Sequence, residues 1–95
     1  MATFYTVECV DGGLEVRLSR EHLTRCRVWM CDDVAGKFLS QLTVEAETAL
    51  RNQMREEYDA VLSRLVALMR AVLDGKPGGS FEVPDDVANI LPFMN

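Results

Sequence analysis

Hydrophobic and polar side chains alternate over residues 4–18, on both sides of a short turn that contains glycine. The apolar side of this alternation consists of Tyr5, Val7, Cys9, Leu14, Val16 and Leu18. Between them, the Asp11-Gly12 pair supplies the positive φ angles that a tight hairpin needs. The pattern therefore predicts a β-hairpin with one apolar face. A two-stranded hairpin is not stable alone in water, so another element must cover that face.

A helical pattern begins near Thr48 and continues to Leu73. Its apolar positions follow i, i+3, i+4 spacing: Met54, Tyr58, Val61, Leu62, Leu65, Leu68, Met69 and Val72. In the second half of the segment, apolar residues occupy most of the helix circumference, which indicates contacts on more than one side. We expect a central core helix that covers the hairpin and ends at Asp74-Gly75, because glycine adopts the left-handed cap without steric cost.

Residues 20–40, between these two patterns, are less regular. Ser19 is a suitable N-cap and Glu21 would lie favourably in a first helical turn, so we expect one or more short helices here. Gly36 is expected to interrupt the helical segment. Residues 42–45 alternate over too short a stretch to distinguish a strand from a helix.

The last part of the chain combines a short strand with a helix start. Phe81 to Val83 is predicted to be the strand. Pro84-Asp85-Asp86 then favours a helix, since proline suits the first helical position and carboxylates suit the positive end of the helix dipole. This helix is expected to run to about Leu91, where Pro92 would stop it.

Length and composition indicate a single folded domain over residues 1–95. The chain is 48% hydrophobic and 26% charged, which is typical of a folded protein. Its 15 acidic and 10 basic residues give a net charge of −5, a balance that disfavours nucleic acid as a partner. We find no secretory signal, and Val61 to Leu73 is too short to span a bilayer. We expect a protein of the cytoplasm or nucleus that does not bind membranes.

Residues that commonly carry catalytic or metal chemistry are few. Cys9, Cys26 and Cys31 form no CxxC motif and accompany one distant histidine, His22, so neither a disulfide framework nor a zinc site is indicated. We interpret Cys26 and Cys31 as buried thiols and His22 as an exposed residue on a helix. The glycine pairs lack the pattern of a phosphate-binding loop. We therefore expect no enzymatic activity, no metal and no cofactor.

The predicted order of elements, together with several local strings, resembles the Elongin C and Skp1 family, relatives of the BTB/POZ fold. The first string covers residues 7–16 and continues with Arg20-Glu21-His22. The second is Val61-Leu62-Ser63-Arg64-Leu65, and the third is the strand and helix start at residues 81–88. The resemblance implies an α+β, BTB/POZ-like fold of the Skp1/Elongin C type, with the N-terminal hairpin packed on a helical core.

The same resemblance implies an adaptor that joins a substrate receptor to a cullin scaffold in a ubiquitin ligase and pairs with an Elongin B-like subunit. A helix of the receptor would insert apolar side chains into a surface near the end of the chain. On this sequence the implied surface consists of Leu73, Phe81, Val87, Ile90, Leu91, Phe93 and Met94.

Three alternatives to the adaptor interpretation stay open at this point. The apolar C-terminal residues could simply complete the core of the domain itself. The chain could form a homodimer as a BTB-like module. It could also be a helical scaffold subunit of another complex, with residues 48–73 as an intermolecular helix.

The adaptor interpretation makes a prediction about the last residues of the chain. Phe93→Ala and Met94→Ala should each weaken binding of the native partner, because aromatic and methionine side chains often anchor such interfaces. The melting temperature should stay nearly unchanged. Two variants that bind as tightly as the wild type, or two that unfold, would assign these residues to the core.

Overall fold

The alternating N-terminal residues form the expected hairpin in the computed structural model, which describes residues 2–53, 55–88 and 90–91. The strands β1 (Thr3–Val10) and β2 (Gly13–Arg20) pair antiparallel, with Val7 opposite Val16. At the turn, Asp11 and Gly12 have φ angles of 50° and 74°. Positive φ at both central positions matches the twist of the flanking strands. The predicted hairpin and its turn are confirmed.

A third strand, β3 (Leu23–Met30), occupies much of the segment expected to be helical, so that prediction is wrong. β2 and β3 form a second hairpin, with Leu18 opposite Cys26. Its turn is made by Glu21 and His22, whose φ angles are 55° and 66°. Non-glycine residues rarely adopt this conformation, which is why the turn was missed. The Glu21 amide donates a 3.2 Å hydrogen bond to the Ala2 carbonyl and helps to hold the turn.

Trp29 obscures the alternation of apolar and polar residues along β3. The strand alternates as strands do, with Val28 and Met30 toward the core, but an indole occupies one of the positions on the other face. The Trp29 ring lies over Gly13, where a Cβ atom would approach it to 2.6 Å. Its Nε1 donates a 2.7 Å hydrogen bond to the Val10 carbonyl. The Trp29 side chain, on the outer face of the sheet, therefore contacts residues on both sides of the first turn and stabilises it.

Two long helices follow the strands, α1 (Asp32–Arg51) and α2 (Glu56–Leu73). Gly36 lies inside α1 and does not interrupt it, and the ambiguous residues 42–45 are helical. The Asn52 amide closes α1 on the Thr48 carbonyl, and Gln53 has a φ of 54°, so the chain reverses direction there. Residues 48–73 are therefore not one continuous helix, and the expected extent of this helix is wrong.

The central helix α2 ends as expected at Asp74-Gly75. Gly75 has a φ of 81°, and the Lys76 amide bonds back to the Ala71 carbonyl. The chain then forms β4 (Gly79–Val83) and α3 (Asp85–Ala88). The start of α3 is confirmed, but the helix ends at Ala88 rather than near Leu91. After α3, the Ile90 amide donates a 3.2 Å hydrogen bond to the Val87 carbonyl, three residues before it. Pro92 lies outside the described residues.

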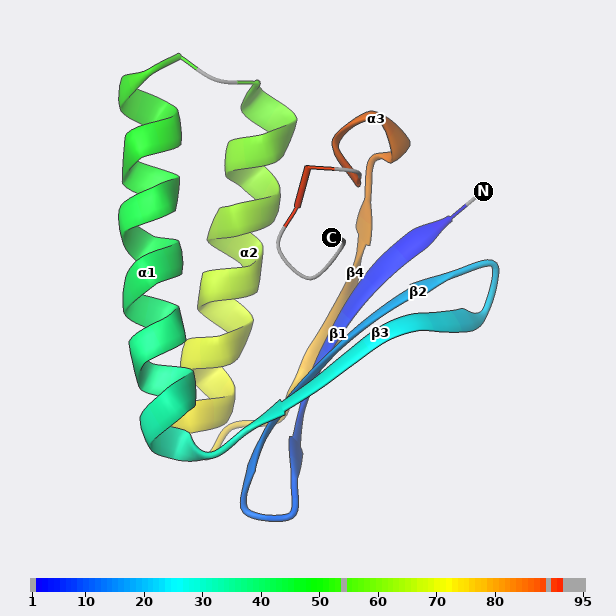
Figure 1. The fold of residues 1–95 in the computed structure, drawn as a ribbon, viewed down its shortest axis with the longest axis vertical. Coiled ribbons are helices and arrows are strands. Elements are labelled where there is room, and N and C mark those ends of the chain that lie inside the picture. The colour runs from blue at the N-terminus through cyan, green and yellow to red at the C-terminus, as the bar shows by residue number, and fades with distance from the viewer. Residues whose placement is uncertain (1, 54, 89, 92–95) are drawn as a thin grey trace.

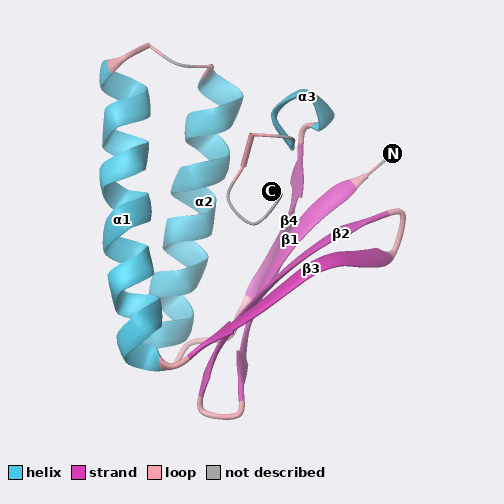
Figure 2. Cartoon of the chain, viewed as in Figure 1, coloured by secondary structure: helices cyan, strands magenta, loops and turns pink. Residues whose placement is uncertain are grey.

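Figures 1 and 2 show the arrangement of these elements: α1 and α2 lie side by side on one face of a four-stranded sheet. The strand order is β3-β2-β1-β4, and each neighbouring pair is antiparallel. The connection from β3 to β4 passes through both helices, so the strands that flank the helical hairpin in sequence form the two edges of the sheet. The protein is a small α+β domain.

The core lies between α2 and the helix-facing side of the sheet. Leu62, Leu65 and Met69 of α2 are fully buried, as are Tyr5 and Val7 of β1. Alternating strand residues and i, i+3, i+4 helix residues therefore meet as expected. The predicted packing of the hairpin on the central helix is confirmed.

Leu65 offers a direct test of this core. It is fully buried, so Leu65→Ala should lower the free energy of unfolding by roughly 2–5 kcal/mol, as measured by chemical denaturation. Ser63→Ala, an exposed substitution one half-turn away on α2, is the control and should change stability by no more than about 0.5 kcal/mol. Equal stabilities for the two variants would contradict the placement of α2.

Candidate partner-binding site

The residues expected to form a partner surface do not share one environment. Val87 and Leu91 are fully buried in the core of the domain itself. Phe81 is 7% exposed, whereas Leu73 is half-buried at the end of α2. Ile90 is the one with a large exposed fraction, 53%, among those that the structure describes. Phe93 and Met94 lie outside the described residues. In this fold, Val87 and Leu91 stabilise the domain and are not available to a partner.

A hollow surface lies beside these residues, between α2 and the edge strand β4. We call it the α2–β4 groove. Its larger part has a volume of about 290 Å³ and is lined by Arg64, Ala67, Leu68, Ser80 and Phe81. A second part, of about 230 Å³, is lined by Glu57, Ala60, Val61, Arg64, Glu82 and Pro84. Because both parts share Arg64, they form one continuous surface along β4.

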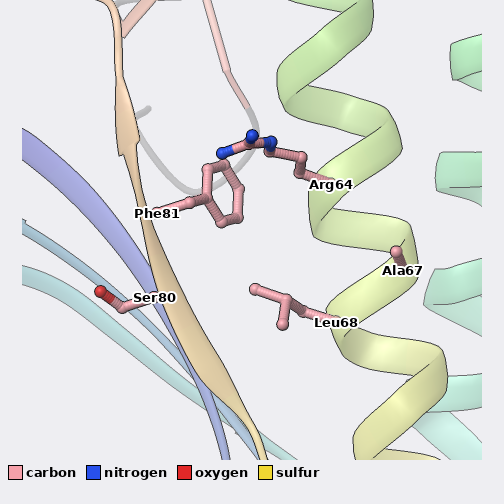
Figure 3. Close-up of a pocket in the computed structure, with 5 residues that line it drawn as sticks. All are labelled: Arg64, Ala67, Leu68, Ser80 and Phe81. Carbon is pink, nitrogen blue, oxygen red and sulfur yellow. The ribbon is translucent and has the colours of Figure 1, made fainter.

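Figure 3 shows how side chains from the two walls approach each other. Arg64 and Leu68 extend from α2 toward β4, and Phe81 extends from β4 toward α2, whereas Ser80 points to the opposite face of the sheet. The floor is apolar and well packed: the Phe81 ring lies 5.7 Å from the Tyr5 ring, centroid to centroid. An apolar side chain from a partner would therefore meet hydrocarbon here.

Small residues on α2 create the space. Ala60 and Ala67 lie two turns apart on the same helix face, and both are exposed beside the groove. On the other wall, Gly79 lies directly against Leu68, where a Cβ atom would approach the Leu68 Cδ2 to 3.3 Å. Larger side chains at these positions would fill the groove.

Charged side chains line the rim of the second part of the groove. Glu57 and Glu82 lie on opposite walls, with Arg64 between the two parts. Among the described residues, neither Arg64 nor Glu82 forms an ion pair. Glu57 lies 3.7 Å from Arg55, and both side chains are half exposed. The rim therefore offers two carboxylates to a basic group that approaches from solvent.

The ion pair between Arg55 and Asp86 positions α3 next to this rim. The Arg55 Nη2 donates a hydrogen bond to the Asp86 Oδ2 and joins the start of α2 to the start of α3. The hydrogen bond from Arg55, together with its charge, lowers the pKa of Asp86 below its usual range. This pair connects two segments that are 31 residues apart.

The side chains of the groove were largely missed by sequence reasoning. Nothing in the helical pattern indicates that Ala60, Arg64 and Ala67 lie beside β4, because that contact depends on how the chain returns after Gly75. Of the expected surface residues that the structure describes, Phe81 alone lines the groove.

Groups with catalytic or ligand potential lie apart from one another. Within the described residues, no cluster of three His, Cys, Asp or Glu side chains could hold a metal ion. His22 is exposed, as expected, but in a strand turn rather than on a helix. Cys26 is half-buried and Cys31 is exposed, so the interpretation of both as buried thiols is wrong for Cys31.

The two tyrosines have structural roles. Tyr58 donates a 2.6 Å hydrogen bond to the Glu45 carboxylate and so joins α2 to α1. Burial, followed by this hydrogen bond, raises the pKa of Tyr58 to about 12. Burial likewise raises the pKa of Tyr5. Both hydroxyls therefore stay protonated at neutral pH and do not act as bases.

Comparisons with protein-family models, with curated proteins and with solved structures return no match to this chain. No helix of the part of the chain that the structure describes is long and apolar enough to cross a membrane.

The Arg55–Asp86 pair predicts a pH-dependent contribution to stability. Because the folded-state pKa of Asp86 is lowered, the contribution is present at neutral pH and is lost as the pH falls below the ordinary value of 3.8. Asp86→Asn should therefore lower the melting temperature at pH 7, and the difference from wild type should shrink in acid. Arg55→Gln is the matched variant: it should give a similar decrease, and the double variant should give little more. A decrease that persists unchanged below the folded-state pKa would contradict this role.

Proposed function

We propose that this protein is a non-catalytic adaptor that binds a partner protein through the α2–β4 groove. The groove itself is the observation that carries the proposal, because it combines an apolar floor with a charged rim on an otherwise well-packed domain. Concave apolar surfaces with a few polar groups are the usual sites of specific recognition.

The proposed partner segment is an amphipathic helix, which binds such grooves through apolar residues on one face. An apolar anchor would enter the larger part of the groove, beside Leu68 and Phe81. A lysine or arginine next to that anchor would lie between Glu57 and Glu82. Ile90, which is 53% exposed, offers a further apolar contact to the partner.

In its finer form, the proposal is an adaptor of the Elongin C and Skp1 type with a BTB/POZ-like fold, which links a substrate receptor to a cullin and pairs with an Elongin B-like subunit. The sequence resemblance supports this form. The observed order of elements departs from the one it implies, because β3 and the long helix α1 stand where short helices were expected. Binding of a cullin by the purified protein, measured directly by calorimetry, separates this form from a general adaptor.

Ala67→Arg tests the adaptor proposal. Ala67 is exposed, and arginine is a good helix former, so the fold should be retained while the long side chain fills the groove. We expect the affinity for the native partner to fall about tenfold or more, because the apolar anchor of the partner can no longer be buried in the groove.

The matched control is Ser63→Arg, which adds the same side chain to an exposed α2 position outside the groove. It should bind like the wild type. Glu82→Lys should also weaken binding, because it reverses the charge that faces the basic residue of the partner. Full binding by Ala67→Arg would place the partner surface elsewhere.

A further inference from the structure

The strand β3 forms the edge of the sheet opposite to the α2–β4 groove. One side of β3 pairs with β2, and among the described residues no strand pairs with its other side. It is eight residues long and contains no proline. An edge strand of this kind presents a row of amide and carbonyl groups to which another extended chain can add.

The charge of this edge is opposite to that of the rest of the molecule. Residues 13–30, which form β2, β3 and their turn, contain four arginines and two acidic residues. The remainder of the chain contains six basic and thirteen acidic residues. A protein with a net charge of −5 therefore concentrates positive charge along one hairpin.

Two of these arginines are held by close contacts within the chain. Arg17 donates a 3.0 Å hydrogen bond to Glu8 on the open face of the sheet. Arg20 donates a 3.1 Å hydrogen bond to the Thr3 hydroxyl. These guanidinium groups stabilise contacts of β2 with β1.

The other two arginines lie on β3 and are directed to solvent. The Arg27 side chain is 58% exposed and approaches Glu15 only to 3.7 Å. Arg25 is exposed, occupies the extra position of a β-bulge, and has no ion pair among the described residues. Among the four arginines of this hairpin, the two that are least neutralised thus lie on the open edge.

The part of β3 beyond the bulge is regular. Residues 26–30 pair in order with residues 14–18 of β2. Cys26 and Val28 are half-buried on the helix side of the sheet, whereas Arg27 lies on the open face. A strand added here would place every second side chain beside Cys26, Val28 and Met30, and the others beside Arg27 and Trp29 on the open face.

We propose that β3 binds an extended acidic segment of a partner protein by strand addition. In this segment, Asp or Glu residues alternate with apolar residues and pair with residues 26–30. The carboxylates face Arg27 and Arg25, and the apolar side chains extend the row of Cys26 and Val28. This surface is separate from the α2–β4 groove and binds a segment of opposite charge, so one domain can hold two different partners.

Charged residues and bulges also protect sheet edges from association, and the experiment must separate that role from binding. The probe is a fluorescent nine-residue peptide in which Glu alternates with Val, titrated with the full chain and followed by fluorescence anisotropy. A peptide with Lys in place of Glu tests charge. A Glu-Val peptide with N-methylated amides on one edge tests strand addition, because it keeps every charge but cannot form the backbone ladder.

We expect the Glu-Val peptide to bind and both control peptides to fail. Hydrogen exchange at residues 26–30 should slow in the complex, while residues 79–83 should be unchanged. Arg27→Gln should weaken binding about two- to fivefold, the range measured for exposed ion pairs, and Arg51→Gln, an exposed arginine at the end of α1, should not.

Four results would overturn the proposal. They are no binding of the Glu-Val peptide at millimolar concentration, equal binding of the N-methylated peptide, protection confined to residues 79–83, and self-association of the protein through β3 in sedimentation measurements. The last result would assign the edge to a second copy of this chain. Because the Ala67→Arg variant retains β3, it should still bind the Glu-Val peptide, so failure of the groove and failure of the edge are distinguishable.

Discussion

The fold depends on the contact between α2 and the helix-facing side of the sheet. That face is built from alternate residues of four strands, and it would be exposed to water without a covering helix. Leu62, Leu65 and Met69 fill it and are fully buried. Other elements add to this contact: α1 packs beside α2, and Val87 of α3 is fully buried in the same core. Disruption of this one interface would therefore unfold the whole domain.

Covering a sheet on one face leaves its two edges open, and this molecule treats them differently. At β4, the strand is five residues long and lies beside α2, whose small side chains leave the α2–β4 groove. At β3, the strand is longer, carries Arg25 and Arg27, and lies away from the helices toward its turn (Figure 1). The groove has carboxylates at its rim and the β3 edge has guanidinium groups. The two surfaces thus favour partners of opposite charge.

The apolar residues near the end of the described chain lie in two different environments. Val87, in α3, and Leu91, three residues after its end, are fully buried, whereas Ile90 is 53% exposed. A sequence pattern cannot separate these neighbours, since α3 is only four residues long and too short to show a helical period. Among the described residues, the proposed interaction surface therefore consists of side chains from α2 and β4 and does not include Val87 or Leu91.

By itself, the sequence determined the elements whose signals are local. Each of these signals depends only on neighbouring residues and could be predicted from the sequence. They are the Asp11-Gly12 turn, the alternation around it, the apolar residues around most of α2, the Gly75 cap and the helix start at Pro84. The second hairpin could not be predicted, because Glu21 and His22 adopt positive φ angles that their residue types disfavour and that the Ala2 contact supports. The groove could not either. Ala60 and Ala67 become a binding wall only when β4 returns beside them, and that approach is decided by packing between segments distant in sequence.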